Sequence, residues 1–118
     1  MPRLATGLAA GVILAACQTT AAVALRPAVL VDATPEALRQ LDRTLAAATG
    51  RGRIKRGPGD VTKEPAIAVL PPPPGPYEGN SPAMPVYFDL VTDGKGCFVR
   101  DRSSGKTHVL RGVSCRPK

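Results

Sequence analysis

Aromatic residues are scarce in this chain, which has no tryptophan, two phenylalanines and two tyrosines among its 118 residues. A core built from this composition must be aliphatic and thin, so its stability margin is small. The scarcity also argues against binding of single-stranded nucleic acid, which uses aromatic side chains to stack on bases. The length allows one small domain and excludes scaffolds such as the α/β barrel, which needs about 250 residues.

Histidine and cysteine are too few for the common metal sites. The one histidine cannot complete a four-ligand zinc site with two cysteines, and the CxxC spacing is absent. The segment GKT at 105–107 is similar to the end of a phosphate-binding loop, but the glycine needed five residues earlier is replaced by Arg100. We therefore expect no metal, no cofactor and no catalytic residue.

The first seventeen residues have the pattern of an export signal. Arg3 supplies a positive charge, and residues 4–16 form an uncharged, mainly apolar run that is too short by itself to span a bilayer. The run ends in the tetrapeptide LAAC at 14–17, whose leucine is a poor residue three positions before an ordinary secretory cleavage site. This tetrapeptide resembles the lipobox of bacterial lipoproteins, L-[AS]-[GA]-C, in which signal peptidase II cuts before the cysteine.

The lipobox resemblance implies a lipid anchor and a compartment. Residues 1–16 would be the signal peptide, Cys17 would carry the acyl chains such as palmitate, and residues 17–27 would form a tether to a domain over 28–118. In this class an aspartate after the cysteine retains the protein in the inner membrane. Gln18 stands at that position, which implies the periplasmic face of the outer membrane. Two alternatives stay open: a single membrane helix over 4–25, and secretion without a lipid.

Two cysteines remain when Cys17 is set aside. In an exported chain, Cys97 and Cys115 are expected to form a disulfide. Their separation of 18 positions would stabilise the fold by about 3 kcal/mol in the chain-entropy interpretation. A redox pair is the alternative interpretation of the same two residues.

The first half of the chain predicts one helix between short strands. Thr34 as N-cap, Pro35 at the first helical position and Gly50 after the last turn indicate an amphipathic helix over 35–49. Its leucines and alanines recur three and four positions apart and line one face. Short strands are expected over 28–32, 51–56 and 66–70, and seven prolines within 71–85 predict an extended crossing.

The last third predicts a three-stranded meander over 86–92, 95–102 and 107–111. A two-residue turn at Asp93-Gly94 would pair Thr92 with Lys95, and a second turn would pair Arg102 with Thr107. Both hairpins then place the same apolar residues on one face of the sheet. These residues are Val86, Phe88, Leu90, Cys97, Val99 and Leu110. With the helix packed across it, this small antiparallel sheet gives an α+β domain.

The densest cluster of positive charge consists of Arg51, Arg53, Lys55 and Arg56. In a strand, alternation would put the first three on one face. Lipid headgroups, lipopolysaccharide phosphates or acidic proteins would suit such a face. A solvated edge strand, whose charges prevent aggregation, is the alternative.

Taken together, these features predict a non-enzymatic lipoprotein of the bacterial envelope with a structural or partner-binding role. Its partners would be the bilayer, reached through Cys17, and an envelope protein. An accessory or inhibitory subunit of a periplasmic enzyme is one alternative. A small hydrolase is another, in which the predicted register places His108 opposite Asp101 and near Ser103. We expect His108 and Asp101 to be an ordinary polar pair at a sheet end.

Overall fold

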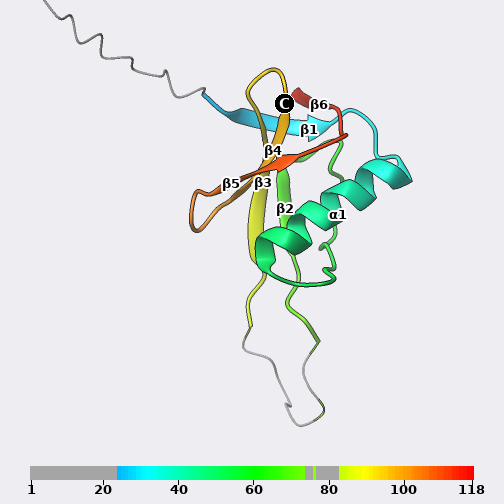
Figure 1. The fold of residues 1–118 in the computed structure, drawn as a ribbon, viewed down its shortest axis with the longest axis vertical. Helices are drawn as coiled ribbons and strands as arrows, with labels where there is room; N and C mark the ends of the chain where they lie inside the picture. The colour runs from blue at the N-terminus through cyan, green and yellow to red at the C-terminus, as the bar shows by residue number, and fades with distance from the viewer. Residues whose placement is uncertain (1–23, 74–75, 77–82) are drawn as a thin grey trace, which may run out of the picture.

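The computed structural model describes residues 24–73, 76 and 83–118. These residues form one helix and an antiparallel sheet of six strands (Figure 1), an arrangement compatible with the α+β class. In chain order the elements are β1 (Arg26–Leu30), α1 (Pro35–Thr49), β2 (Ala66–Val69), β3 (Val86–Thr92), β4 (Cys97–Asp101), β5 (Thr107–Leu110) and β6 (Cys115–Pro117). The predicted signal peptide, Cys17 and most of the predicted tether lie outside the described residues, as do positions 74–75 and 77–82 of the proline-rich segment.

β3 is the central strand of the sheet. The strand order is β5-β4-β3-β1-β6, and β2 also pairs with β3. β4 runs along one edge of β3, while β2 and β1 share the other edge. β2 pairs with the first half of β3, from Val69 opposite Val86 to Ala66 opposite Asp89. β1 pairs with the end of β3, where Pro27 lies opposite Val91. The two ends of β3 therefore have different neighbours.

The helix lies where the sequence predicts it. The Ala37 amide donates to Thr34 Oγ1 over 3.1 Å, which satisfies one of the free N–H groups of the first turn. Gly50 ends the helix at φ +69°, a left-handed conformation that glycine adopts without a steric penalty. Leu41 and Leu45 are fully buried, and α1 crosses in front of the sheet in Figure 1.

One aliphatic cluster forms the core between α1 and the sheet. Phe88 is its one aromatic member and is fully buried. Five of the six residues expected on the apolar face of the meander belong to this cluster, and Val86 packs against it. The buried members are Leu30, Leu41, Leu45, Val61, Ile67, Val69, Phe88, Leu90, Cys97, Val99 and Leu110.

The meander is confirmed, but both of its predicted registers are wrong by two residues. Thr92 pairs with Cys97 instead of Lys95, and Thr107 pairs with Arg100 instead of Arg102. A shift by an even number keeps every side chain on its original face. The apolar face was therefore predicted correctly although its cross-strand pairs were not.

Aspartate side chains explain why both turns are longer than expected. Asp93 Oδ1 accepts hydrogen bonds from the amides of Lys95, at 2.7 Å, and Gly96, at 2.8 Å, which closes a loop over 93–96. Asp101 Oδ1 does the same for the Ser103 amide at 2.8 Å. Such side-chain bonds hold turn amides that have no partner in the strand ladder, so they stabilise turns longer than the predicted ones.

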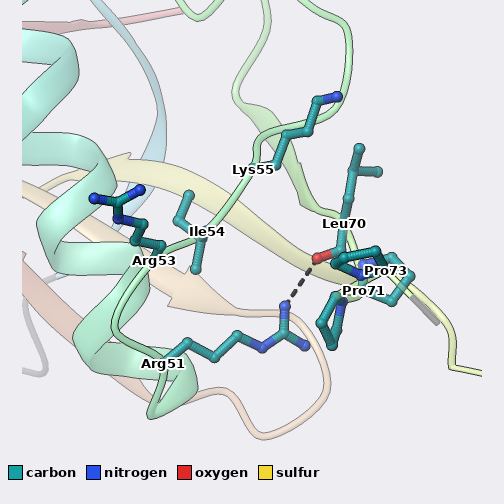
Figure 2. Close-up of a pocket in the computed structure, with 8 residues that line it drawn as sticks. Arg51, Arg53, Ile54, Lys55, Leu70, Pro71 and Pro73 are labelled. Carbon is teal, nitrogen blue, oxygen red and sulfur yellow. Dashed lines mark hydrogen bonds between the residues drawn. The ribbon is translucent and has the colours of Figure 1, made fainter. Parts of the chain in front are cut away.

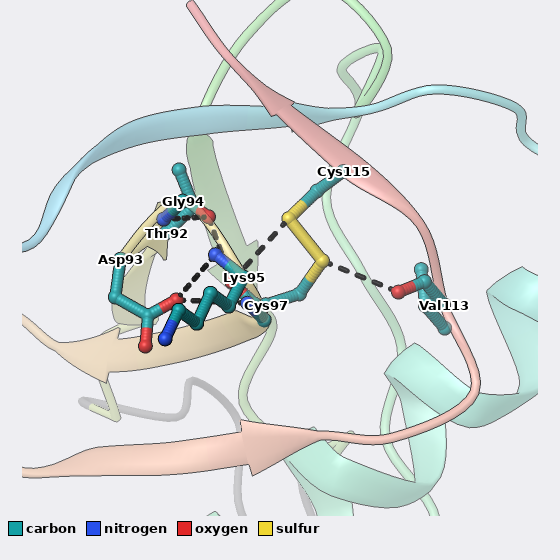
Figure 3. The surroundings of a disulfide bond; sticks show 8 residues. Thr92, Asp93, Gly94, Lys95, Cys97, Val113 and Cys115 are labelled. Carbon is teal, nitrogen blue, oxygen red and sulfur yellow. Dashed lines mark hydrogen bonds between the residues drawn. A yellow bond between two sulfur atoms is a disulfide. The ribbon is translucent and has the colours of Figure 1, made fainter.

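The last strand of the domain, β6, was not indicated by the sequence and pairs with the first strand, β1. In this pairing Leu30 lies opposite Cys115, and Ala28 lies opposite Pro117. β1 itself begins and ends two residues earlier than the strand expected over 28–32. The disulfide between Cys97 and Cys115, with its Cα atoms 6.0 Å apart, ties β6 back to β4 (Figure 3). This confirms the predicted pairing of the two cysteines.

Candidate functional site

The segment after α1 is a loop, and the strand expected over 51–56 is wrong. Within it, Arg56 forms an isolated bridge with Val69. The loop nevertheless lies along the free edge of β2, because the Leu70 amide donates to the Lys55 carbonyl oxygen over 2.8 Å. Ile54 is the one apolar residue of the segment, and one anchor cannot sustain a regular strand. We call residues 51–55 the basic ridge.

Arg56 does not act with the other cations of the cluster. Its Nε donates to Asp42 Oδ1 over 2.6 Å, which ties the end of the loop to α1. The side chains are 23 % and 42 % exposed, so this is a surface ion pair of modest energy, about 0–1 kcal/mol. The charge of Arg56 is balanced, whereas the ridge cations have no such acidic partner among the described residues.

The three cations of the ridge point in different directions (Figure 2). Arg51 extends beneath the ridge, and its Nη1 donates to the Leu70 carbonyl oxygen over 2.8 Å. Arg53 points toward α1, and Lys55 points away from α1 and from the Arg51 side chain. The common face predicted from strand alternation therefore does not form.

Two surface grooves flank the ridge. The proline groove has a volume of about 500 Å³ and lies between the ridge and the chain that leaves β2, where Leu70 and the prolines at 71–73 form its other wall. The helix groove, of about 290 Å³, lies between the ridge and α1, where it is lined by Arg39 and Arg43. Arg53 and Ile54 line both grooves, so the two grooves adjoin each other along the ridge.

Positive charge is concentrated around these grooves. The basic residues from 39 to 56 number six of the sixteen in the chain, and Asp42 is the one acidic residue of the nine in the same stretch. This surface therefore carries five of the seven net positive charges of the chain. The six cations are Arg39, Arg43, Arg51, Arg53, Lys55 and Arg56.

The Ser-His-Asp arrangement considered from the sequence does not assemble. His108 pairs with Val99, not with Asp101 as the predicted register required. The Asp101 carboxylate accepts hydrogen bonds from the hydroxyl and the amide of Ser103, which hold the pKa of Asp101 below its usual value. This carboxylate serves the turn and does not orient the imidazole.

A second polar site lies on the outer face of β3 and was not predicted. Arg102 donates from Nη2 and Nε to the two carboxylate oxygens of Asp89, at 2.8 and 3.1 Å. Its guanidinium also stacks 5.3 Å from the centre of the Tyr87 ring. The hydrogen bonds to Asp89 raise the pKa of Arg102. Alternation along β3 puts Tyr87 and Asp89 on the same face, but the pairing of the strands was needed to bring Arg102 to them.

No group of three potential metal-ligating side chains occurs in the parts of the chain that the structure describes. Within the same residues no helix is long and apolar enough to cross a bilayer. No protein-family model, no curated protein and no solved structure matches this chain.

Proposed function

We propose that this chain is a lipid-anchored protein of the bacterial envelope whose domain binds a partner and catalyses no reaction. The observation that carries the anchor is the sequence LAAC at 14–17, placed directly after an uncharged apolar run. The disulfide supports an exported location, because such bonds persist in oxidising compartments. It also leaves Cys17 as the one cysteine of the three that is free to be acylated.

The position of β1 bears on how such an anchor would hold the domain. Nine residue steps separate Cys17 from Arg26, which span roughly 30 Å when fully extended. Arg26 pairs with Thr92 at one end of β3, whereas Val69, next to the proline groove, pairs with Val86 at the other end. Six residues along a strand cover about 20 Å. An anchored domain therefore presents the proline groove at the end of β3 far from the tether, toward the periplasm if Gln18 directs the protein to the outer membrane.

Metabolic labelling tests the anchor. The full chain, its Cys17→Ser variant and a Cys97→Ser/Cys115→Ser double variant would be expressed in a bacterial host and labelled with palmitate. We expect the label on the wild type and on the double variant. The Cys17→Ser variant should lack the label and accumulate as the larger precursor at the inner membrane.

The double variant is the matched control, because it removes every other thiol and leaves the lipobox intact. Labelled Cys17→Ser protein would contradict the lipid anchor. A wild type without label, of full precursor mass and held in the membrane, would favour a single membrane helix over 4–25 instead.

A further inference from the structure

We infer that the two grooves and the basic ridge form one site for an acidic, extended peptide segment of another envelope protein. An apolar side chain of that segment would sit on Ile54 and Leu70, and its carboxylates would contact cations on both sides of the ridge. This inference rests on the partner-binding role proposed above and is independent of the lipid anchor.

Charge determines the sign of the ligand. Arg39 and Arg43 are exposed on α1, one helical turn apart, and Arg53 lies across the helix groove from them. Asp42, the one acidic residue that lines either groove, is bound by Arg56. Among the described residues, the positive field of this surface is therefore not compensated by a nearby free carboxylate, and it attracts an anionic partner.

The wall of the proline groove favours a peptide over phosphate. Pro71, Pro72 and Pro73 have no N–H group, so their backbone supplies hydrogen-bond acceptors and no donors. Peptide amides can donate to such a wall, whereas phosphate oxygens cannot. Ile54, Leu70 and Pro71 are half-buried and give the groove an apolar floor that a phosphate would gain nothing from covering.

The arginine content favours carboxylates that are held in a defined geometry. Five of the six cations between 39 and 56 are arginine, whose planar fork binds a carboxylate through two parallel hydrogen bonds. Arg51 is held in place through Nη1 by the Leu70 carbonyl oxygen. The other N–H groups of this guanidinium have no partner within the described part of the chain and are free to meet a carboxylate.

Fluorescence anisotropy with the full chain in mild detergent tests the site. The probe is a fluorescein-labelled decapeptide in which glutamates flank a central leucine. The comparison peptides carry serine in place of the leucine, or lysines in place of the glutamates. We expect the leucine peptide to bind several-fold more tightly than the serine peptide, because its leucine side chain leaves water on the partly exposed Ile54 and Leu70, and we expect the lysine peptide not to bind.

Charge-matched variants locate the binding. Arg53→Ala/Lys55→Ala removes two exposed cations of the ridge and should weaken binding by about fivefold or more. Lys63→Ala/Lys106→Ala removes two exposed cations elsewhere and should change the affinity by less than about twofold. Circular dichroism of each variant verifies that the fold is retained.

Four outcomes would overturn the inference. Equal affinity for the leucine and serine peptides would show that no apolar side chain of the peptide sits on Ile54 and Leu70. Equal losses in the two double variants would show attraction by net charge alone. Tight binding to phosphatidylglycerol vesicles, abolished by Arg53→Ala/Lys55→Ala and without peptide binding, would make the ridge a membrane contact. Failure of peptide binding in a chain whose Cys17 is labelled with palmitate would leave the anchor standing and remove this site.

Discussion

Arg51 and Leu70 lie 19 positions apart in the sequence and are joined by one hydrogen bond, from the guanidinium to the carbonyl oxygen, over 2.8 Å. This bond links the loop after α1 to the end of β2 and closes the floor of the proline groove.

Removal of this bond should loosen the end of β2. Arg51→Met keeps most of the side-chain volume and leaves the Leu70 carbonyl without its partner, so we expect a loss of about 1–2 kcal/mol in the free energy of unfolding. Urea denaturation measures the loss, and faster exchange of the Leu70 amide locates it. Arg53→Ala, at an exposed position of the same loop, should cost less than about 0.5 kcal/mol; equal costs for both variants would contradict a specific role of the bond.

Reduction of the disulfide should release the C-terminal strand first. The bond ties β6 to β4, and β6 has no other strand neighbour than β1 in the described sheet. We expect a loss of about 3 kcal/mol, with hydrogen exchange rising first in β6, β1 and β5. The amides of α1 should stay better protected, because this helix has its own caps and buried side chains. Unchanged protection of the meander after reduction would reopen the interpretation of Cys97 and Cys115 as a redox pair.

The N-cap of α1 can be tested with a matched pair of threonines. Thr34→Ala removes the acceptor of the Ala37 amide and should cost about 1 kcal/mol, whereas Thr34→Ser should cost little. Thr44, inside the helix, donates to the Gln40 carbonyl oxygen, which is already bound within the helix. Thr44→Ala should therefore leave stability unchanged or raise it slightly. Thermal unfolding of the three variants measures the order, and a greater cost at Thr44 than at Thr34 would contradict the cap.

The turn aspartates make stability depend on acid. Amide hydrogen bonds from Gly96 and Lys95 lower the pKa of Asp93, and the hydroxyl and amide of Thr62 lower that of Asp60. A lowered pKa in the folded state means that the charged form stabilises the fold. This contribution is complete above the unfolded pKa, near about 3.9, and is lost as the pH falls through the folded value.

The free energy of unfolding should therefore fall as the pH is lowered from about 5 to about 2. The Asp93→Asn variant, which keeps the acceptor oxygen and removes the charge, should flatten part of that fall. Asp32→Asn, at an exposed position before α1, is the control. An unaltered acid profile in the Asp93→Asn variant would contradict the assignment.

The elements that could be predicted are those whose cause is local. The bounds of α1 follow from Thr34, Pro35 and Gly50, which act on their own neighbours. The pairing of Cys97 with Cys115 follows from there being no other candidates once Cys17 is set aside.

Errors arose wherever a side chain could compete with the backbone or where a partner came from far along the chain. Asp93 accepts a hydrogen bond from the Lys95 amide, which the predicted hairpin had assigned to the ladder, and Asp101 accepts one from the Ser103 amide in a turn that begins earlier than predicted. The three residues of β6 carry no periodic signal, and their partner strand, β1, lies at the opposite end of the domain's sequence. Such contacts depend on the whole fold because neither segment contains both halves of the interaction.

The sequence by itself determined which residues form the helix, which face of the meander is apolar, and which cysteines pair. It could do so because side-chain alternation and helical spacing are properties of a single segment. The tertiary structure alone decided that Arg51 reaches Leu70, that Arg53 turns toward α1, and that grooves lie on both sides of the ridge. The direction of each of these cations is set by hydrogen-bond partners and packing surfaces that only the folded chain brings within reach.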